Sequence, residues 1–277
     1  MIMAAELHKH AAREGLRFDQ IEKDYVIAWL LWGLARSKAV RSKSWVFKGG
    51  TCLRHCYYRG YRFSEDIDLS CNRDQGGMDA ATGILAAVAS AVQARSGVQI
   101  RLKEPREVPQ EMQIEFLVEY SRGGARRRGL PCVQVHLTFD EPVLDTVRSG
   151  RIAPPYRDIA SFSMPRYSKP EIIAEKMRTL LQQQEKWPRP RDLYDLWFML
   201  CRAKERVKGV RLRQLFHEKC SVRGIKGDSN ALVSNRFKEW NRRAWTNALG
   251  PMMREVPDYE QVWNEWRNVH SLIFLKK

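Results

Sequence analysis

The sequence lacks the long apolar segments of membrane and secreted proteins. Its densest apolar run, YVIAWLLWGLA, is shorter than the roughly 20 residues that a membrane-spanning helix needs, and Glu22, Lys23 and Asp24 come directly before it. The first residues, MIMAAELHKHAAREG, contain no apolar stretch of the kind that forms the middle of a signal peptide. We therefore expect no membrane span and no export.

Cysteine is sparse, and its spacing indicates no zinc site. The six cysteines are scattered and contain no C-x-x-C pair. Because disulfides persist in oxidising compartments, this usage in a chain that we do not expect to be exported predicts a reduced, cytoplasmic protein. The cysteines are Cys52, Cys56, Cys71, Cys132, Cys201 and Cys220.

Acidic residues are outnumbered by basic ones. The chain has 48 Lys and Arg against 32 Asp and Glu, which gives a net charge of +16. A positive field attracts polyanions and accelerates their encounter. The charge could serve solubility alone, but its clustering favours a nucleic acid as partner. In the glycine-rich cluster SRGGARRRG, we expect Arg126, Arg127 and Arg128 to bind RNA.

The 277 residues allow one large domain or two modest ones, and their patterns divide into three parts. Residues 1–150 alternate strand and helix patterns, beginning with a helix over 18–36 with Asp19 as its N-cap. Residues 151–168 are rich in proline and polar residues, which predicts a linker or lid. Residues 169–277 are almost entirely helical. We therefore predict an α+β protein with a mixed β-sheet, N-terminal helices and a helical C-terminal region.

The first part contains five strand patterns. The last of them alternates clearly, with Val133, Val135, Leu137 and Phe139 on one face. The arginine cluster joins it to the preceding strand, as in a hairpin. In chain order, the five patterns are SWVFKGG, RFSEDIDLS, VQIRLKE, EMQIEFLVEYS and CVQVHLTFD.

A strand that ends at Gly49-Gly50-Thr51 and is followed by a helix is an arrangement that suits anions. Glycine lets a phosphate approach the backbone, and the start of a helix offers N–H groups and a partial positive charge. The hydroxyl of Thr51 can add one more donor. Alone the turn is a weak signal, because a glycine pair can cap a helix without any ligand, and the G-x-x-x-x-G-K spacing of a P-loop is absent.

Asp66 and Asp68 lie two residues apart in a strand pattern, so both side chains project from one face while Ile67 and Leu69 turn into the core. Neighbouring carboxylates repel each other unless a cation lies between them. A pair of Mg²⁺ ions bound to both carboxylates and to a triphosphate removes the repulsion and favours phosphoryl transfer. The alternative is a solvated face of an edge strand, but the glycine turn one short helix upstream favours a site.

Three charged side chains of the helical part fall on buried helix faces. In PEIIAEKMRTLLQ, Lys176 lies inside the apolar arc, where a lysine either extends to the surface or reaches a partner such as a phosphate. In RDLYDLWFML, Asp192 and Asp195 lie three residues apart on one face of a buried helix. We favour a functional role for Asp192. For Asp195, function and structural ion pairing are equal alternatives, and its expected partners are Arg191, Lys176 and Arg178.

Together these motifs resemble the AbiEii/AbiGii toxin family of nucleotidyltransferases. The resemblance covers roughly residues 18–200 and is most specific between Lys48 and Ser70. The last 75 or so residues carry no motif that we can assign. In the family's order, the matching motifs are IEKDY, FKGGTCLRHCY, RFSEDIDLS, EKMRTLL and RDLYDLW.

The resemblance implies a fold related to DNA polymerase β and transfer of a nucleoside monophosphate from an NTP, with Mg²⁺ as cofactor. It also implies a toxin of a toxin–antitoxin or phage-defence system with a cognate antitoxin, and some members modify tRNA 3′ ends. On this pattern Asp66 and Asp68 bind metal and act in catalysis together with Lys176 and Asp192. The residues expected to bind the nucleotide are Lys48, Gly49, Gly50, Thr51, Arg62, Ser64, Arg178 and Asp195.

The sequence departs from the polymerase β pattern at one position. Relatives often carry a third carboxylate on a later strand, where this chain has His136. Either Asp140 or the helical Asp192 takes the place of that carboxylate, or activation of the acceptor hydroxyl is weak.

Three functions stay open at this level. The first is transfer to a nucleic-acid hydroxyl, with the tRNA 3′ end as the expected acceptor and a block of translation as the result. The second is transfer to a protein hydroxyl. The third is a non-catalytic module that binds RNA or a partner on a decayed transferase fold. The sequence does not show which NTP is used.

Overall fold

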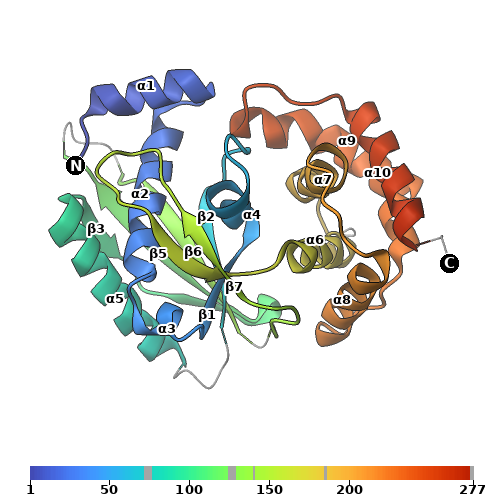
Figure 1. Cartoon of the computed structure of the whole chain (residues 1–277), viewed down its shortest axis with the longest axis horizontal. Helices are drawn as coiled ribbons and strands as arrows, with labels where there is room; N and C mark the ends of the chain where they lie inside the picture. Colours follow the sequence, from blue (N-terminus) through green and yellow to red (C-terminus); the bar gives the residue numbers. More distant parts are fainter. Residues whose placement is uncertain (72–76, 124–128, 140, 184–185, 275–277) are drawn as a thin grey trace. The chain divides into compact units, whose positions relative to one another are not determined.

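The chain divides into two units. The first contains Met1–Val143 and Val147–Tyr167, and the second contains Leu144–Thr146 and the chain from Ser168 onward. The structure, a computed structural model, describes residues 1–71, 77–123, 129–139, 141–183 and 186–274 (Figure 1).

A mixed β-sheet forms the centre of the first unit. Among the described residues it has eight strands, of which seven follow the order β3-β5-β6-β2-β1-β8-β7, while β4 pairs with β5 beside this path. Two pairs are parallel, β2 with β6 and β1 with β8, and the other pairs are antiparallel. The strands are β1 (Trp45–Lys48), β2 (Asp66–Cys71), β3 (Gln99–Leu102), β4 (Arg106–Val108), β5 (Gln113–Ser121), β6 (Cys132–Phe139), β7 (Arg148–Ile152) and β8 (Phe162–Arg166).

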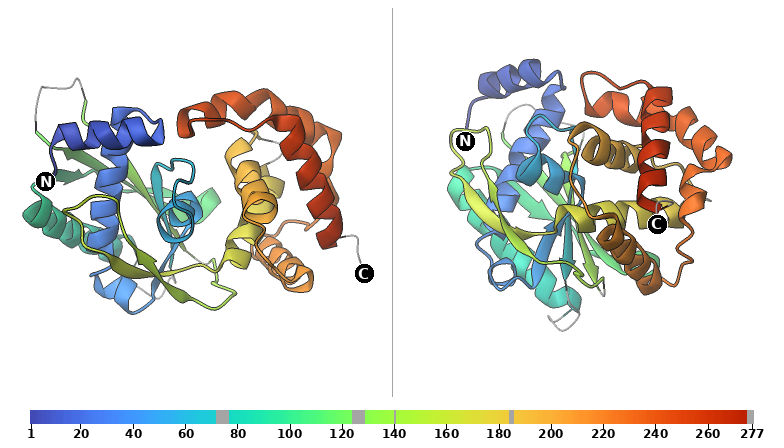
Figure 2. Two further views of the ribbon diagram at one scale, coloured as in Figure 1. Left: turned by 45° about the horizontal axis from the view of Figure 1, so that its top comes forward. Right: turned by 45° about the vertical axis from the view of Figure 1, so that its right-hand side comes forward.

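Two long helices pack against this sheet. α2 (Phe18–Leu34) contacts β6, α5 (Gly77–Ser96) contacts β3, and the two helices lie side by side (Figures 1 and 2). The predicted inward face of β6 is confirmed, because Val133, Val135 and Leu137 are almost completely buried. The other helices of this unit are α1 (Ala4–Glu14), α3 (Lys38–Arg41), α4 (Gly49–Cys52), the π-helix η1 (Leu53–Tyr57) and the 3₁₀ helix η3 (Pro109–Glu111).

The second unit is helical. α6 contacts α7 and α8, and α7 also contacts α9 and α10. Leu193, Leu215 and Trp266 are fully buried in its core. Its helices are α6 (Lys169–Gln183), α7 (Pro190–Trp197), η4 (Phe198–Arg202), α8 (Gly209–Val222), η5 (Ser229–Val233), α9 (Asn235–Leu249), η6 (Gly250–Met252) and α10 (Tyr259–Phe274).

The predicted α+β class, with a mixed β-sheet, N-terminal helices and a helical C-terminal region, is confirmed. The interpretation of residues 151–168 as a linker or lid is wrong, because β7 and β8 pair there as an antiparallel hairpin and β8 extends the sheet beside β1. Pro165 lies within β8. Proline gives up one ladder hydrogen bond, which is tolerated here because the register of β8 with β1 is confined to Arg166 opposite Phe47.

Two smaller expectations are also corrected. The N-cap of α2 is Arg17, so Asp19 lies inside the first turn, where its carboxylate binds the Arg17 guanidinium at 3.0 Å.

In the described part of the chain, α5 is long and apolar enough to cross a membrane by length and composition, contrary to the expectation that no segment could do so. A single such helix is weak evidence for a span, and α5 packs against α2 and β3.

A fully buried ion pair joins two helices of the second unit. Lys219 Nζ on α8 lies 3.0 Å from Glu171 Oε1 on α6, and neither side chain is exposed. Glu171 also accepts hydrogen bonds from the backbone N–H groups of Leu144 and Asp145, at 2.7 and 3.2 Å. Burial raises the pKa of Glu171, and the charge of Lys219 opposes this effect. The pair therefore holds the excursion Leu144–Thr146 in the helical unit.

We expect Lys219→Met to lower the free energy of unfolding by about 3–5 kcal/mol, because it leaves the Glu171 carboxylate buried without its cation. Urea denaturation measures the change. Arg242→Met is the matched control, since the Arg242–Glu239 pair lies at the surface, and this variant should unfold nearly as the wild type does. Equal destabilisation by both variants would contradict the special role of the buried pair.

Candidate active site

The glycine turn after β1 lies directly against β2. Gly49 has a φ of +79°, a left-handed conformation that favours glycine. A β-carbon at this position would lie 2.0 Å from Asp68 Oδ2. A β-carbon at Gly50 would lie 2.9 Å from Ser64 Oγ and 3.0 Å from a guanidinium nitrogen of Arg62. The two glycines thus bring the backbone against three of the predicted site residues.

β2 begins at Asp66 and presents both carboxylates on one face. Ile67 and Leu69 are fully buried, whereas Asp66 and Asp68 are partly exposed, as the alternation predicts. Burial raises the pKa of Asp66 to about 6, and the negative charge of Asp68 adds to this increase. The carboxylates therefore form a place where a bound cation would be stabilised.

Thr51 supports the strand that carries the two carboxylates, and its side chain is not available to a ligand. Its side chain is fully buried, and its hydroxyl donates to the backbone carbonyl oxygen of Asp66. The expected phosphate donor is thus engaged within the protein. Thr51 holds α4 against the start of β2 and so fixes the position of the first carboxylate.

His136 lies beside Asp68 across the parallel strands β2 and β6. Its Nδ1 donates to Asp68 Oδ1 at 3.0 Å. Burial would lower the pKa of His136, but the hydrogen bond with Asp68 and the charges of Asp68 and Asp66 raise it above its ordinary value. His136, which occupies the position where a third carboxylate was expected, therefore orients the carboxylate of Asp68. Asp140, the alternative acid, lies outside the described residues.

One acid near this face was missed by the sequence analysis. Glu141 Oε2 lies 2.7 Å from Lys48 Nζ, and both side chains are almost fully buried. Lys48 ends β1 in register with Asp68, so the pair lies beside the carboxylates on the sheet. The position of Glu141 just after β6 could have indicated a role near this face. Its partner Lys48 could not be predicted, because it is 93 residues away in the chain.

The IEKDY motif supports the helix that follows the glycine turn. Asp24, which is almost fully buried, accepts hydrogen bonds from Arg54 Nε at 2.8 Å and from the Tyr156 hydroxyl at 2.7 Å. Arg54 also donates to Glu14 Oε2 at 2.5 Å and to the carbonyl oxygen of Tyr61 at 2.6 Å. Because Arg54 belongs to η1, which continues α4, this network fixes the helix against α2.

The charged residues of the helical part form a buried cluster within the second unit. Lys176 Nζ lies 2.7 Å from Asp192 Oδ1 and 2.5 Å from Asp195 Oδ2, and Arg189 Nε binds the second oxygen of Asp192. Burial would raise the pKa of Asp192, but Arg189 and Lys176 hold it well below its usual range. Of the partners considered for Asp195, Lys176 is observed. Arg178 is also buried and donates to Gln182 at 2.6 Å.

The predicted RNA-binding residues Arg126, Arg127 and Arg128 lie outside the described residues. The strands before and after them, β5 and β6, form an antiparallel pair, as the hairpin prediction requires.

The donor set beside the glycine turn fits a hard divalent cation. Mg²⁺ is usually bound by one or two carboxylates together with water and substrate phosphates. Asp66 and Asp68 supply the carboxylates, and the raised pKa of Asp66 indicates that the protein alone does not balance their charge. No group of three or more His, Cys, Asp or Glu side chains in the described ranges is arranged to hold a metal. Substrate and water oxygens would therefore complete the coordination.

A family model and several solved structures match this chain. The model, described as "Nucleotidyl transferase AbiEii toxin, Type IV TA system", matches residues 32–269. Among proteins with curated functions, none matches the sequence.

The fold is similar to that of MenT4, nucleotidyltransferase toxin Rv2826c from Mycobacterium tuberculosis H37Rv, with a TM-score of 0.72 and 19% identity over 100% of this chain and 91% of that one. It is also similar to JHP933 from Helicobacter pylori, with a TM-score of 0.59 and 17% identity over 93% of each chain. A putative nucleotidyltransferase from H. pylori has a TM-score of 0.59 and 19% identity over 93% of this chain and 96% of that one. At these identities the likeness establishes the fold.

We expect Gly49→Ala to lower the free energy of unfolding by about 1–3 kcal/mol, because the added methyl group meets the Asp68 carboxylate in a left-handed backbone. Gly83→Ala is the matched control. Gly83 lies within α5, where a β-carbon meets no atom within 4 Å, so alanine should stabilise the helix by about 0.5–1 kcal/mol. Urea denaturation compares the two variants. A neutral Gly49→Ala would mean that Asp68 does not constrain the turn.

Proposed function

The chain belongs to the AbiEii family of nucleotidyltransferase toxins of type IV toxin–antitoxin systems, and on this premise we propose that it transfers a nucleoside monophosphate from an NTP to the 3′ end of tRNA. The observation that carries the proposal is the position of Asp66 and Asp68 on one strand face, directly against the glycine turn at Gly49. In the proposed reaction, the two carboxylates would hold a metal beside a backbone that a triphosphate would approach.

The glycine turn and its neighbours would bind the triphosphate. The first backbone N–H groups of a helix have no partners within it, and α4 continues directly into η1, so the turn opens a two-part helix. Arg62 and Ser64 lie against the backbone of Gly50, where a cationic and a hydroxyl group suit phosphate oxygens. Lys48 contributes positive charge at the end of β1, shared with Glu141.

Asp66 and Asp68 would hold Mg²⁺. A bound divalent cation neutralises charge on the phosphates and polarises the phosphoryl group. His136 orients the Asp68 carboxylate through its hydrogen bond, and Thr51 fixes Asp66 through the backbone. In the reaction, the oxygen of the acceptor hydroxyl forms a bond to the α-phosphorus while the bond from the α-phosphorus to the bridging oxygen of the β-phosphate breaks. Pyrophosphate leaves, and the hydroxyl proton is released to water. Positioning and electrostatics supply most of the rate in such transfers.

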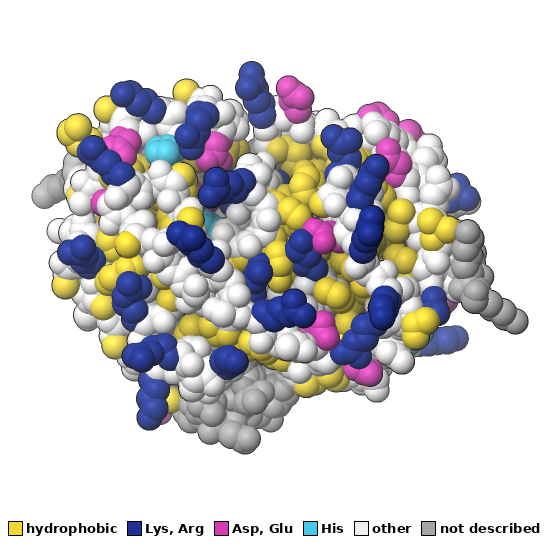
Figure 3. Space-filling view, in the orientation of Figure 1, with side chains coloured by type: hydrophobic (Ala, Val, Ile, Leu, Met, Phe, Trp, Pro, Cys, Tyr) yellow, Lys and Arg dark blue, Asp and Glu magenta, His cyan; other side chains and the backbone are white. Residues whose placement is uncertain are grey.

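The charge of the chain supports a nucleic acid as acceptor. The net charge is +16, and Figure 3 shows Lys and Arg side chains spread over the visible face among fewer acidic ones. A nucleotide added to the 3′ end of tRNA would stop its aminoacylation and so block translation, which is the expected action of a toxin. With tRNA as acceptor, the protein acts in the cytoplasm, where an antitoxin of the same system would counteract it.

The roles of Lys176, Arg178, Asp192 and Asp195 in phosphate contact or catalysis stay predictions of the family resemblance. Their ion-pair cluster provides buried cations and anions within the second unit. The same cluster also stabilises the packing of α6 against α7. Loss of activity in a variant of this cluster is therefore informative only if the variant unfolds as the wild type does.

Label transfer tests the reaction. We expect the protein, incubated with Mg²⁺, total tRNA and each α-labelled NTP in turn, to transfer label to tRNA with at least one NTP. Asp66→Asn keeps the shape of the side chain but removes its charge, so it should abolish transfer. Asp79→Asn, at an exposed position in the first turn of α5, is the matched control and should act as the wild type does.

The product distinguishes the acceptors. Label on protein in place of RNA would replace the tRNA proposal with protein modification. An equal amount of label on tRNA with wild type and Asp66→Asn would remove Asp66 from the reaction.

Removal of divalent cations tests the metal. We expect EDTA to abolish label transfer and excess Mg²⁺ to restore it, because the carboxylates of Asp66 and Asp68 cannot neutralise phosphate charge themselves. Binding of Mg²⁺ should also lower the pKa of Asp66 from its value of about 6, which NMR titration of the side-chain carboxyl measures. Transfer at full rate in EDTA would contradict the metal role of these residues.

A further inference from the structure

The second unit contains an open groove that the proposed reaction leaves without a role. Its volume is about 710 Å³, within the range typical of ligand-binding sites. One wall is the face of α9 from Arg236 to Ala248, and the other is formed by Pro188 in the segment before α7.

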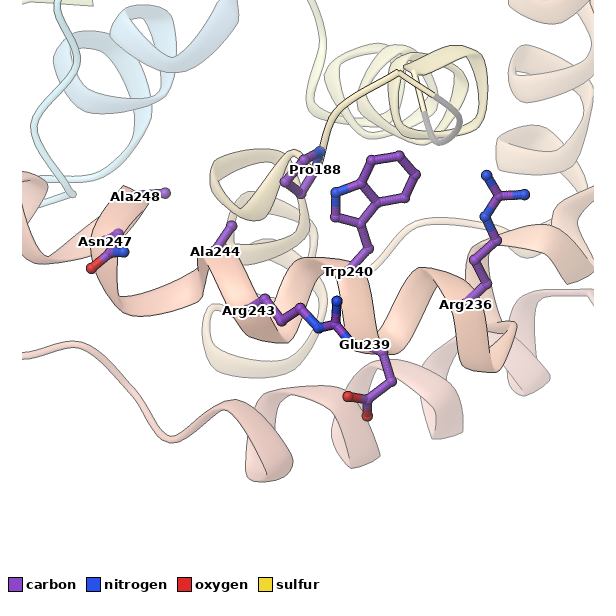
Figure 4. A pocket seen from close by; sticks show the side chains of 8 residues that line it. All are labelled: Pro188, Arg236, Glu239, Trp240, Arg243, Ala244, Asn247 and Ala248. Carbon is purple, nitrogen blue, oxygen red and sulfur yellow. The ribbon is translucent and has the colours of Figure 1, made fainter.

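An aromatic ring and two guanidinium groups dominate the groove. Trp240 points from α9 toward Pro188, and Arg236 and Arg243 flank it along the helix (Figure 4). The Arg236 guanidinium lies 5.7 Å from the ring centroid of Trp240. A second tryptophan, Trp187, is 52% exposed and lines a small adjoining cavity together with Trp240. Accessible tryptophan rings at one place suit a flat ligand.

The groove is also positively charged. α9 carries four basic side chains and a single acidic one, Glu239. This acid is already bound by Arg242, with 2.9 Å between Nη2 and Oε2. Glu239 also lines the groove, but the two guanidinium groups of Arg236 and Arg243 outnumber it, so the lining keeps a net positive charge that complements a phosphate backbone.

We propose that this groove binds a single-stranded stretch of the RNA acceptor, with a base stacked on Trp240 and neighbouring phosphates at Arg236 and Arg243. This inference rests on the proposed function, because RNA is taken as the acceptor. Unstacked bases bind to aromatic side chains and arginine planes, and basic grooves follow the backbone between them. The side-chain amide of Asn247 adds a donor and an acceptor for a base edge. Tryptophan and arginine also occur at protein interfaces, but the excess of positive charge favours the polyanion.

The groove is connected to the buried cluster of the same unit. The backbone N–H of Arg189 donates to Asn241 Oδ1 at 3.1 Å, which ties the Pro188 wall to α9. The side chain of Arg189 binds Asp192, and Asp192 binds Lys176. RNA in the groove would therefore contact Pro188, which precedes Arg189 in the chain. Arg189 binds the cluster of Lys176 and Asp192 to which the family resemblance assigns a catalytic role.

RNA binding without NTP tests the groove separately from catalysis. The probe is a fluorescently labelled tRNA transcript, titrated with the full-length protein and followed by anisotropy at several salt concentrations. We expect Trp240→Ala to weaken binding about fivefold or more, the effect of losing one stacked base, and Trp240→Phe to restore most of it. We expect Arg236→Glu/Arg243→Glu to weaken binding further and to reduce the slope of log K against log salt by about 1 for each phosphate that the variant no longer neutralises.

Two controls separate local from general effects. Arg254→Glu/Arg267→Glu changes the net charge by the same amount at exposed positions of the second unit that do not line the groove, and it should bind RNA more nearly as the wild type does. Thermal unfolding shows whether each variant is folded. Asp66→Asn should bind RNA as the wild type does, because its defect lies in transfer.

The outcomes separate this proposal from the proposed function. If the groove variants bind tRNA as tightly as the wild type while Asp66→Asn loses transfer, the groove proposal is wrong and the reaction stands. If the groove variants lose binding but no protein transfers label, the groove stands and the reaction is wrong. Equal losses in the groove variants and in Arg254→Glu/Arg267→Glu would show unspecific attraction and overturn the groove. Loss of binding to a purified antitoxin, with tRNA binding intact, would assign the groove to protein.

Discussion

The close approach of the Gly49 backbone to the Asp68 carboxylate is the constraint on which the candidate site depends. A β-carbon at that position would lie 2.0 Å from Asp68 Oδ2, so any residue other than glycine would displace the carboxylate or strain the turn, given the register of β1 and β2 that places Lys48 opposite Asp68. The remaining contacts secure this arrangement from other sides. Thr51 bonds the backbone of Asp66, and His136 bonds the side chain of Asp68. Contacts within the protein thus position the carboxylates, although the two groups repel each other.

This positioning has an energetic cost that the fold carries permanently. The pKa of Asp66 is raised to about 6 by burial and by the charge of Asp68, which means that ionising it is less favourable than in water. A fold selected only for stability would replace one acid by a neutral residue. The cost is instead found where a cation and a phosphate would relieve it, and the hydrogen bond of Arg54 to Asp24 ties the helix after the turn to α2.

The parts of the fold that were predicted correctly depend on local patterns. The alternation of Asp66 and Asp68 with Ile67 and Leu69, and that of β6, are properties of a strand with a period of two, so the sequence shows them directly. The contribution of β8 to the sheet could not be seen, because Pro165 normally ends a strand and its tolerance here depends on how little of β8 pairs with β1. The partners of Thr51 and Lys48 were not visible either, since a hydroxyl or ammonium group has many possible acceptors and the sheet register selects one.

The buried ion pairs of the second unit are better explained by the positions in which they hold chain segments than by their contribution to the free energy of unfolding. Buried ion pairs seldom stabilise a fold more than apolar residues of the same size would, yet α6 carries two of them, through Glu171 and Lys176. The first holds the excursion Leu144–Thr146 within the helical unit. The second shares Asp192 with Arg189, whose backbone closes one wall of the α9 groove. Replacing such pairs by leucine would keep the helices packed, but it would remove the Glu171 acceptor of the Leu144 and Asp145 backbone and the Asp192 carboxylate that binds the Arg189 side chain. The charges are therefore retained where the relative position of two segments matters more than the free energy of the pair.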